Sequence, residues 1–171
     1  MATQITALIL DDDEDSTAFL KYQLLSSLPN IHIESRLEPD VAGDFDIYFI
    51  DNDFQGEQFA GQLAKRVRKS DQNALVIAFS AFLDAPTLKQ LINSGCDGAF
   101  EKQNREEFGL LIDIVRKYIA ARGEQAIQGK AKGLLGTIHS ITDLLREWNL
   151  RLESHSQHLV NKKNSTSKDA A

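Results

Sequence analysis

The stretch ALILDDDEDST (residues 7–17) places four apolar residues directly before five consecutive acidic ones. A short apolar run of this kind is typical of a buried β-strand. Adjacent like charges disfavour one another's ionised form unless a cation neutralises them. The acids therefore have two interpretations: the N-terminus of a following helix, where Asp and Glu are favourable, or a cation site. We expect residues 13–15 to belong to the helix N-terminus, and we leave Asp11 and Asp12 open at this point.

Short apolar runs alternate with longer segments of helical periodicity from residue 5 to residue 121. The predicted strands are 5–10, 31–33, 47–50, 74–79 and 98–100, and the predicted helices are 16–28, 57–70, 85–95 and 105–121. Several strands lack polar alternation, as expected for central strands that are covered on both faces. The order predicts an α/β fold: a doubly wound, five-stranded parallel sheet. Residues 35–44 leave room for only one or two helical turns, so we expect a shortened second helix.

The composition is that of a globular protein, with 42% hydrophobic and 26% charged residues among 171. No apolar run reaches the roughly 18–20 residues needed to cross a bilayer, and no signal peptide begins the chain, so we expect a cytoplasmic protein with no membrane association. The single cysteine, Cys96, excludes an internal disulfide. Residues 123–171 carry a net charge of +2 and residues 1–122 a net charge of −8. Without a clustered basic face, nucleic acid is not an expected partner.

Chemically reactive side chains follow four of the predicted strands. They are Asp11 and Asp12, then Asp51, then Ser80, and finally Lys102. Ligands of doubly wound sheets bind beyond the carboxyl ends of the strands, which is where these residues fall. A few hard oxygen ligands suit Mg²⁺, and a carboxylate beside Mg²⁺ and Lys is a plausible nucleophile for phosphoryl transfer. The chain has no phosphate-binding loop of the G-x-x-x-x-G-K-[ST] type, so ATP is not an expected direct donor.

Taken together, these strand ends resemble the receiver domain of two-component response regulators. The resemblance covers residues 4–121 and rests on LILDDDED (8–15), DIYFIDNDFQGE (46–57), AFSA (78–81) and SGCDGAFEK (94–102). It implies a flavodoxin-like receiver fold and a bound Mg²⁺. The ion would be held by Asp11 and Asp12, directly or through water, by Asp51, and by the backbone carbonyl of Asp53.

The resemblance also implies a function for the remaining strand-end residues. Asp51 would accept a phosphoryl group from a sensor histidine kinase or a phosphotransfer protein. Ser80 would bind the phosphoryl group and Lys102 would pair with it. The chain would then be a signalling protein rather than an enzyme, beyond its own phosphorylation and dephosphorylation.

Several positions depart from the family pattern. Family members usually have Met-Pro-Gly shortly after the acceptor, where this chain has FQG (54–56) and an additional acid, Asp53. The family lysine usually precedes a cis proline; Gln103 stands there, and we expect a trans bond or a strained cis bond. The family's switch aromatic falls at Ala99, while the adjacent Phe100 should point to the opposite face of its strand and into the core.

Two alternative functions stay open, and Ala99 and Gln103 favour the first of them. A degenerate receiver would act as a scaffold or binding module without phosphorylation. A phosphatase would use Asp51 as nucleophile and Asp53 as acid, as in the Asp-x-Asp motif of haloacid dehalogenases. The motif usually follows the first strand in that family, and Gln55 stands where a Thr or Val is usual.

The C-terminal part is predicted to form a helical extension (123–161), beginning with a polar hinge (123–128) and followed by a disordered tail (162–171). Apolar residues of the extension recur every three or four positions, which is the signature of a helix that pairs with another helix. The seam residues are Leu134, Ile138, Ile141, Leu145, Trp148 and Leu152. We expect homodimerisation or docking to a partner helix, although packing back onto the receiver is also open. The extension has no helix-turn-helix pattern, and His139 lacks the companions of a phosphotransfer histidine.

Overall fold

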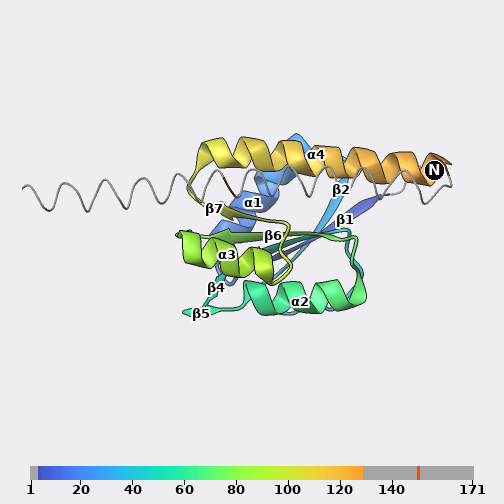
Figure 1. Ribbon diagram of the computed structural model, residues 1–171. Helices are drawn as coiled ribbons and strands as arrows, with labels where there is room; N and C mark the ends of the chain where they lie inside the picture. Colours follow the sequence, from blue (N-terminus) through green and yellow to red (C-terminus); the bar gives the residue numbers. More distant parts are fainter. Residues whose placement is uncertain (1–3, 129–149, 151–171) are drawn as a thin grey trace, which may run out of the picture.

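The structure, a computed structural model, describes residues 4–128 and Leu150 (Figure 1). Its elements in chain order are β1 (Ile5–Leu10), α1 (Glu14–Ser27), β2 (Ile31–Arg36), β3 (Ile47–Asp51), β4 (Asp53–Phe54), β5 (Glu57–Gln58), α2 (Ala60–Ser70), β6 (Leu75–Ser80), α3 (Ala85–Asn93), β7 (Gly98–Glu101) and α4 (Arg105–Gln128). No helix of these described residues is long and apolar enough to cross a membrane.

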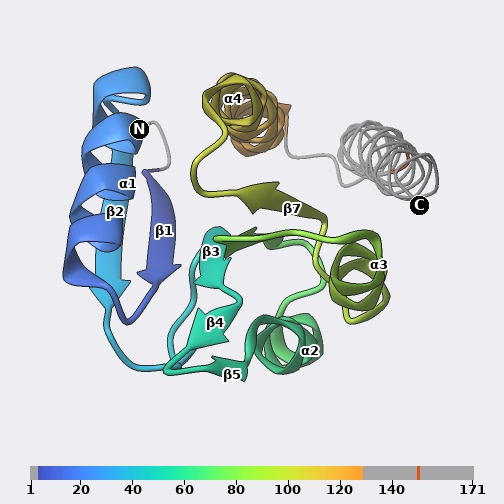
Figure 2. The ribbon, with the colours of Figure 1, turned by 90° about the vertical axis from the view of Figure 1, so that its left-hand side faces the viewer.

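Five strands form one parallel sheet in the order β2-β1-β3-β6-β7, and β4 pairs with β5 in a separate antiparallel hairpin. Helices α1 and α4 cover one face of the sheet, and α2 and α3 cover the other (Figure 2). The doubly wound parallel sheet expected from the sequence is confirmed. Because the strand order reverses direction between β1 and β3, the carboxyl ends of these two strands form the switch point where ligands bind in such sheets.

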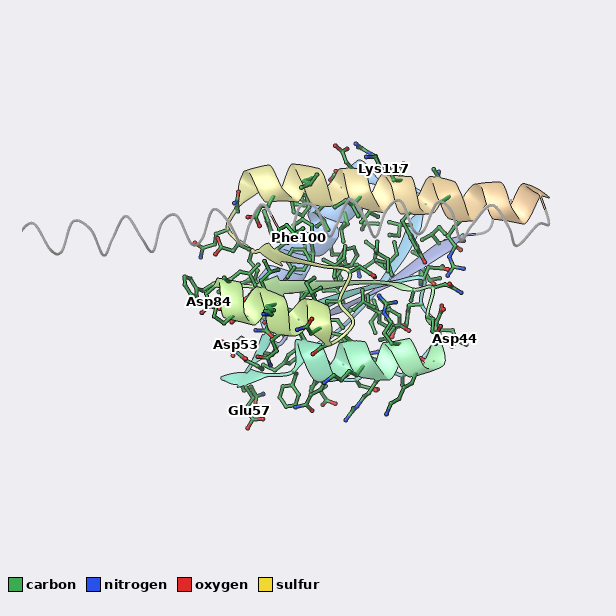
Figure 3. The ribbon with its side chains drawn as sticks, in the orientation of Figure 1. Asp44, Asp53, Glu57, Asp84, Phe100 and Lys117 are labelled. Atoms are coloured by element: carbon green, nitrogen blue, oxygen red, sulfur yellow. The ribbon has the colours of Figure 1, made fainter. Side chains whose placement is uncertain are left out.

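The two faces of the sheet bury separate apolar clusters. Ile9, Phe49 and Phe100 belong to the cluster beneath α1 and α4, whereas Tyr48 and Ala99 belong to the cluster beneath α2 and α3. This alternation follows from the period of two along a strand. Figure 3 shows Phe100 between the sheet and α4, and its ring stacks on that of Phe79 at 6.1 Å. Phe100 is therefore a core residue, as predicted.

A loop replaces the short second helix that we expected between β2 and β3. The described residues 37–46 contain no helical turn. Arg36 orders this loop by donating hydrogen bonds to the carbonyl oxygens of Asp40 (3.0 Å) and Ala42 (2.7 Å). The hydroxyl of Tyr48 donates to the carbonyl of Gly43, whose positive φ of 109° a glycine adopts readily. Side-chain donors thus satisfy the carbonyl groups that a helix would have satisfied internally.

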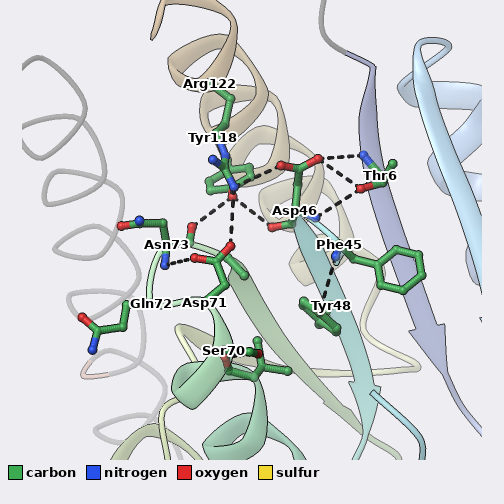
Figure 4. Close-up of polar contacts among 12 residues, drawn as sticks. Thr6, Phe45, Asp46, Tyr48, Ser70, Asp71, Gln72, Asn73, Tyr118 and Arg122 are labelled. Carbon is green, nitrogen blue, oxygen red and sulfur yellow. Dashed lines mark hydrogen bonds and ion pairs between the residues drawn. The ribbon is translucent and has the colours of Figure 1, made fainter. Parts of the chain in front are cut away.

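Helix α4 is anchored at the amino edge of the sheet (Figure 4). Arg122 Nη2 lies 3.0 Å from Asp46 Oδ1 and 3.8 Å from Asp71 Oδ2. The hydroxyl of Tyr118 lies 2.9 Å from the carbonyl oxygen of Asp46 and 3.0 Å from that of Asn73, and it accepts a hydrogen bond from Arg122 Nε. These contacts hold the Tyr118 and Arg122 turn of the helix to the starts of β3 and β6.

Helix α4 also runs through the segment that we predicted to be a hinge. The helix continues without interruption from Arg105 to Gln128, so residues 123–128 are helical and the expectation of a hinge there was wrong. Residues 105–121 show helical periodicity, but residues 123–128 are mainly polar. No sequence pattern therefore predicted that the helix would continue through them. The seam residues from Leu134 to Leu152 and the tail (162–171) lie outside the described residues.

Candidate functional site

Three carboxylates converge at the carboxyl edge of the sheet. Leu10 of β1 pairs with Ile50 of β3, which places Asp11 and Asp51 at neighbouring strand ends. Asp11, Asp12 and Asp51 each direct a carboxylate oxygen to a common region, where these atoms lie within 4.8 Å of one another. Asp11 and Asp51 are buried and Asp12 is half-buried. The parallel pairing of β1 and β3 thus brings together acids that are about forty residues apart in the chain.

Lys102 reaches into this cluster from the end of β7. Its ammonium nitrogen lies 2.7 Å from Asp11 Oδ2 and 3.1 Å from Asp51 Oδ2. Burial lowers the pKa of this amine, but the hydrogen bond to Asp11 and the charges of Asp51 and Asp11 outweigh burial and raise the pKa above its ordinary value. The lysine is therefore a cation that partly balances the charge of the acids.

The loop that carries Lys102 is held without a cis peptide bond. All peptide bonds of the described residues are trans, including the one before Gln103. The Lys102 amide donates to the carbonyl of Ser80 (2.9 Å), and the amide of Glu101 donates to the buried carboxylate of Glu107 (2.9 Å). Gln103 therefore does not prevent the lysine from reaching both acids.

Asn104 and Glu107 form a variant of the capping box at the start of α4, which sequence reasoning missed: the glutamate carboxylate accepts from the Asn104 side chain, while the Asn104 backbone amide donates to the carbonyl of Glu101. The side-chain amide of Asn104 donates to Glu107 Oε1 (2.8 Å), and the amide of Glu107 donates back to Asn104 Oδ1 (3.3 Å). The signal was present in the sequence as Asn followed three positions later by Glu. This box joins the beginning of α4 to the lysine loop.

Asp51 is buried at the end of β3, as Asp11 is beyond the end of β1. Its Oδ1 atom is buried and has no hydrogen-bond partner among the described residues. Burial raises the pKa of this carboxyl to about 6, since the attraction of Lys102 only partly offsets the desolvation and Asp11 adds to it. A buried carboxylate oxygen without a donor is ready to accept a cation or to act as a nucleophile.

The acids of the 11–15 run divide between the two interpretations left open above. Asp13 is the N-cap of α1, and its carboxylate accepts from the amides of Asp15 (2.9 Å) and Ser16 (3.0 Å). Asp11 accepts from Lys102, from the hydroxyl of Ser16 (2.6 Å) and from the amide of Asp13 (3.1 Å). Asp12 accepts from a backbone amide described below. The helix cap and the acidic cluster are thus adjacent and are joined by the hydrogen bonds of Asp11 to the start of α1.

Ser80 lies at the same edge, at the end of β6, but its hydroxyl donates to the carbonyl of Phe82 (2.7 Å). Its role in binding a phosphoryl group remains a prediction. Ala99 lies on the face of the sheet opposite to Phe100, so no aromatic side chain stands at the position of the family's switch residue. Asp53 is exposed, and its carboxylate accepts from the amide of Gly56 (3.0 Å).

The donor set fits a divalent cation that prefers oxygen. The convergence of three carboxylates within 4.8 Å leaves more negative charge than one ammonium balances, and Oδ1 of Asp51 lacks a donor. Mg²⁺ takes carboxylate oxygens and keeps several waters, which matches a cluster of this size. The residues present therefore fit Mg²⁺ chemically, with Asp11, Asp12 and Asp51 as the candidate ligands.

Comparison with solved structures identifies the fold. The signal receiver domain of a DNA-binding response regulator from Colwellia psychrerythraea 34H superposes with a TM-score of 0.61 at 22% identity, over 68% of this chain and 98% of that one. The chain has the receiver fold.

Two further receiver structures support the same conclusion. A response regulator from Clostridium difficile matches with a TM-score of 0.59 at 20% identity, over 68% of this chain and 97% of that one. A receiver protein from Pseudoalteromonas atlantica matches with a TM-score of 0.58 at 17% identity, over 68% of this chain and 98% of that one. No protein-family model matches the sequence, and no curated protein matches it either. At these identities the structures establish the receiver fold, and the function has to be argued from the site.

Proposed function

We propose that this protein is a cytoplasmic two-component response regulator that accepts a phosphoryl group on Asp51 in a Mg²⁺-dependent reaction. The phosphoryl donor is a sensor histidine kinase or a phosphotransfer protein. The output is a protein–protein interaction made through the C-terminal extension rather than DNA binding.

One observation carries this proposal: the contact between Lys102 and Asp51. Oδ2 of the buried Asp51 lies 3.1 Å from the Lys102 ammonium, whereas its Oδ1 has no donor among residues 4–128. One oxygen of this carboxylate is thus paired with a cation, and the other is open to a ligand. An aspartate with a purely structural role is usually satisfied by donors of the fold, as the helix cap Asp13 is by two backbone amides. The receiver fold supplies the same edge of the sheet as the place for a ligand.

The reaction is a transfer of the phosphoryl group from a phosphohistidine nitrogen to a carboxylate oxygen of Asp51. The oxygen–phosphorus bond forms as the phosphorus–nitrogen bond breaks, and the released imidazole is left with the electron pair of that bond. The Lys102 ammonium, 3.1 Å from Asp51 Oδ2, would attract the developing charge on the phosphoryl oxygens, and the hydroxyl of Ser80 would have to turn from Phe82 to donate to one of them. Mg²⁺, held by Asp11, Asp12, Asp51 and the carbonyl of Asp53, would offset the remaining negative charge.

The C-terminal extension is the proposed route of output. Helix α4 leaves the amino edge of the sheet as one continuous helix, anchored by Arg122 and Tyr118. We propose that the apolar seam beyond it forms a homodimer or binds a partner helix. Its residues are Leu134, Ile138, Ile141, Leu145, Trp148 and Leu152.

The test is phosphorylation of the full chain by acetyl phosphate in the presence and absence of Mg²⁺. We expect intact-mass spectrometry to detect one added phosphoryl group with Mg²⁺, and none with EDTA or in the Asp51→Asn variant. Asp53→Asn is the matched control, since this exposed acid two residues away should not be the acceptor. Phosphorylation that persists in Asp51→Asn would contradict the assignment.

A second candidate is a receiver that serves as a scaffold without phosphorylation. The observations in its favour are Ala99 at the switch position and the Ser80 hydroxyl bound to Phe82. Beryllofluoride with Mg²⁺, a stable mimic of the phosphoryl group, separates the two candidates. For a phosphoacceptor, we expect this addition to change the amide chemical shifts of residues around Asp51 and Ser80. An unchanged spectrum would favour the scaffold.

A further inference from the structure

A tight hairpin stands beside the acidic cluster and was not predicted from the sequence. Strands β4 and β5 pair Asp53 with Gln58 and Phe54 with Glu57, so that only Gln55 and Gly56 form the turn. Both turn residues have positive φ, 54° for Gln55 and 86° for Gly56, as a two-residue turn between twisted strands requires. Figure 3 shows Asp53 and Glu57 at the edge of the molecule where this hairpin lies.

The hairpin has a fixed base and an exposed tip. Phe54 is buried, its ring meets that of Phe59 edge-on at 6.1 Å, and the amide of Phe59 donates to the carbonyl of Asn52 (3.2 Å). Gln55 and Gly56 are exposed, and a Cβ added at Gly56 would meet nothing within 4 Å. A movement of the tip therefore need not disturb the packing at the base.

The tip contacts the candidate cation site through one backbone group. The amide of Gln55 donates to Oδ2 of Asp12 at 2.9 Å, across 43 positions of the sequence. Hydrogen bonds from a backbone amide to a carboxylate are charge-assisted and strong. The amide presents a positive dipole to Oδ2 of Asp12, and a divalent cation bound to this oxygen would compete with the amide for its lone pairs and be repelled by the dipole.

The residue type at position 55 makes this contact possible. Receiver sequences usually have a proline there, which lacks an N–H and is restricted to a φ near −65°. Gln55 has both the N–H and the left-handed backbone that directs it to Asp12. The presence of FQG (54–56) in place of Met-Pro-Gly thus provides the backbone amide that contacts Asp12.

We propose that the β4–β5 hairpin is a cation-dependent latch. The Gln55 amide donates a hydrogen bond to Asp12 in the cation-free protein, and a divalent cation at Asp11, Asp12 and Asp51 displaces this amide and releases the hairpin tip. The exposed surface formed by residues 55–57 then differs between the two states. This inference rests on the proposed function, because it requires the acidic cluster to bind a divalent cation.

The test is a titration of the ¹⁵N-labelled full chain with MgCl₂ at constant ionic strength, monitored by amide NMR. We expect the Gln55 amide proton to move upfield and to exchange with solvent about tenfold faster at saturation, since it loses a charged acceptor. The amide of Tyr118, in the part of α4 at the amino edge of the sheet and therefore opposite the cluster, should keep its exchange rate.

Two substitutions at one position form a matched pair. Gln55→Pro removes the N–H and cannot adopt the turn, so we expect Mg²⁺ to bind about tenfold more tightly than to the wild type. Gln55→Gly keeps the N–H and favours the positive φ, so its Mg²⁺ affinity should be equal to or lower than that of the wild type. Gly56→Ala disfavours the turn without a steric clash, and its affinity should rise even if Gln55→Pro fails to fold.

The outcomes separate this inference from the function on which it rests. One outcome is that Mg²⁺ changes the amide chemical shifts around Asp51 while the Gln55 amide stays protected from solvent exchange. In that case the latch is wrong and the cation site stands. Equal Mg²⁺ affinity of Gln55→Gly and Gly56→Ala would also reject the latch. If neither the wild type nor any variant binds Mg²⁺, both the latch and the Mg²⁺-dependent function fail.

Discussion

The ammonium of Lys102 lies 3.1 Å from Oδ2 of Asp51, although the two residues belong to the ends of non-adjacent strands, β7 and β3. Strand β6 separates them in the sheet, so the long lysine side chain has to cross one strand end to reach the aspartate. It also contacts Asp11 at 2.7 Å, which makes it the bridge between two buried acids. The predictions below start from this arrangement.

Replacing Lys102 by Met should destabilise the protein by about 2 kcal/mol at neutral pH, because two buried carboxylates then lack their shared cation. Urea unfolding measures this cost. Lys117→Met, on the exposed side of α4, is the control and should cost about 0.5 kcal/mol or less. In an Asp51→Asn background the cost of Lys102→Met should shrink, since one of the two repelling acids is already neutral. A cost that is equal in both backgrounds would show that the lysine and Asp51 are not coupled.

Asp51→Asn should stabilise the cation-free protein at neutral pH. The pKa of Asp51 is about 6 in the folded protein against an ordinary value of 3.8, so between these values the folded state holds a proton that the unfolded state releases. Stability contributed by the neutral carboxyl is therefore lost as the pH rises through this window. The variant should gain up to about 3 kcal/mol near pH 7 and almost nothing near pH 4, as measured by urea unfolding with EDTA. A gain of the same size at both pH values would contradict this assignment.

Arg122 should contribute more to the free energy of unfolding than Arg116, although both are arginines of α4 that pair with an aspartate. Arg122 is half-buried between Asp46 and Asp71, whereas the Arg116–Asp113 pair is solvent-exposed. We expect Arg122→Ala to cost about 1–2 kcal/mol and Arg116→Ala about 0.5 kcal/mol or less in thermal or urea unfolding. Equal costs would mean that the cluster in Figure 4 does not anchor the helix.

The oligomeric state tests the proposed output. We expect multi-angle light scattering to give a dimer for the full chain and a monomer for the Leu145→Asp variant, because a charge in the apolar seam opposes pairing. Ser140→Asp introduces the same charge outside the seam and should leave the dimer intact. A monomeric wild type would reject homodimerisation and leave binding of a partner helix or packing back onto the receiver as the role of the extension.

The alternation of apolar and helical segments was sufficient to predict the doubly wound sheet, because strands buried on both faces are short and uniformly apolar, as β3 is. The same pattern placed Asp11, Asp12 and Asp51 at strand ends, and parallel strands bring their carboxyl ends to one edge. Helix α1 was harder to interpret. Phe19 and Tyr22 are exposed on its outer face, so its apolar residues do not mark the buried side alone.

The sequence by itself thus determined the five-stranded parallel sheet, the receiver fold by family resemblance, and the gathering of acids at one edge. Only the tertiary structure decided what each side chain contacts there: Lys102 bridges Asp11 and Asp51, Ser80 turns to Phe82, and the Gln55 amide binds Asp12. The physical reason is range. Hydrophobic periodicity is a pattern among residues close in sequence. The contacts of Asp12 with Gln55 and of Asp11 with Lys102 span 43 and 91 positions. They depend on how whole strands pack and on turns whose backbone angles no local pattern specified.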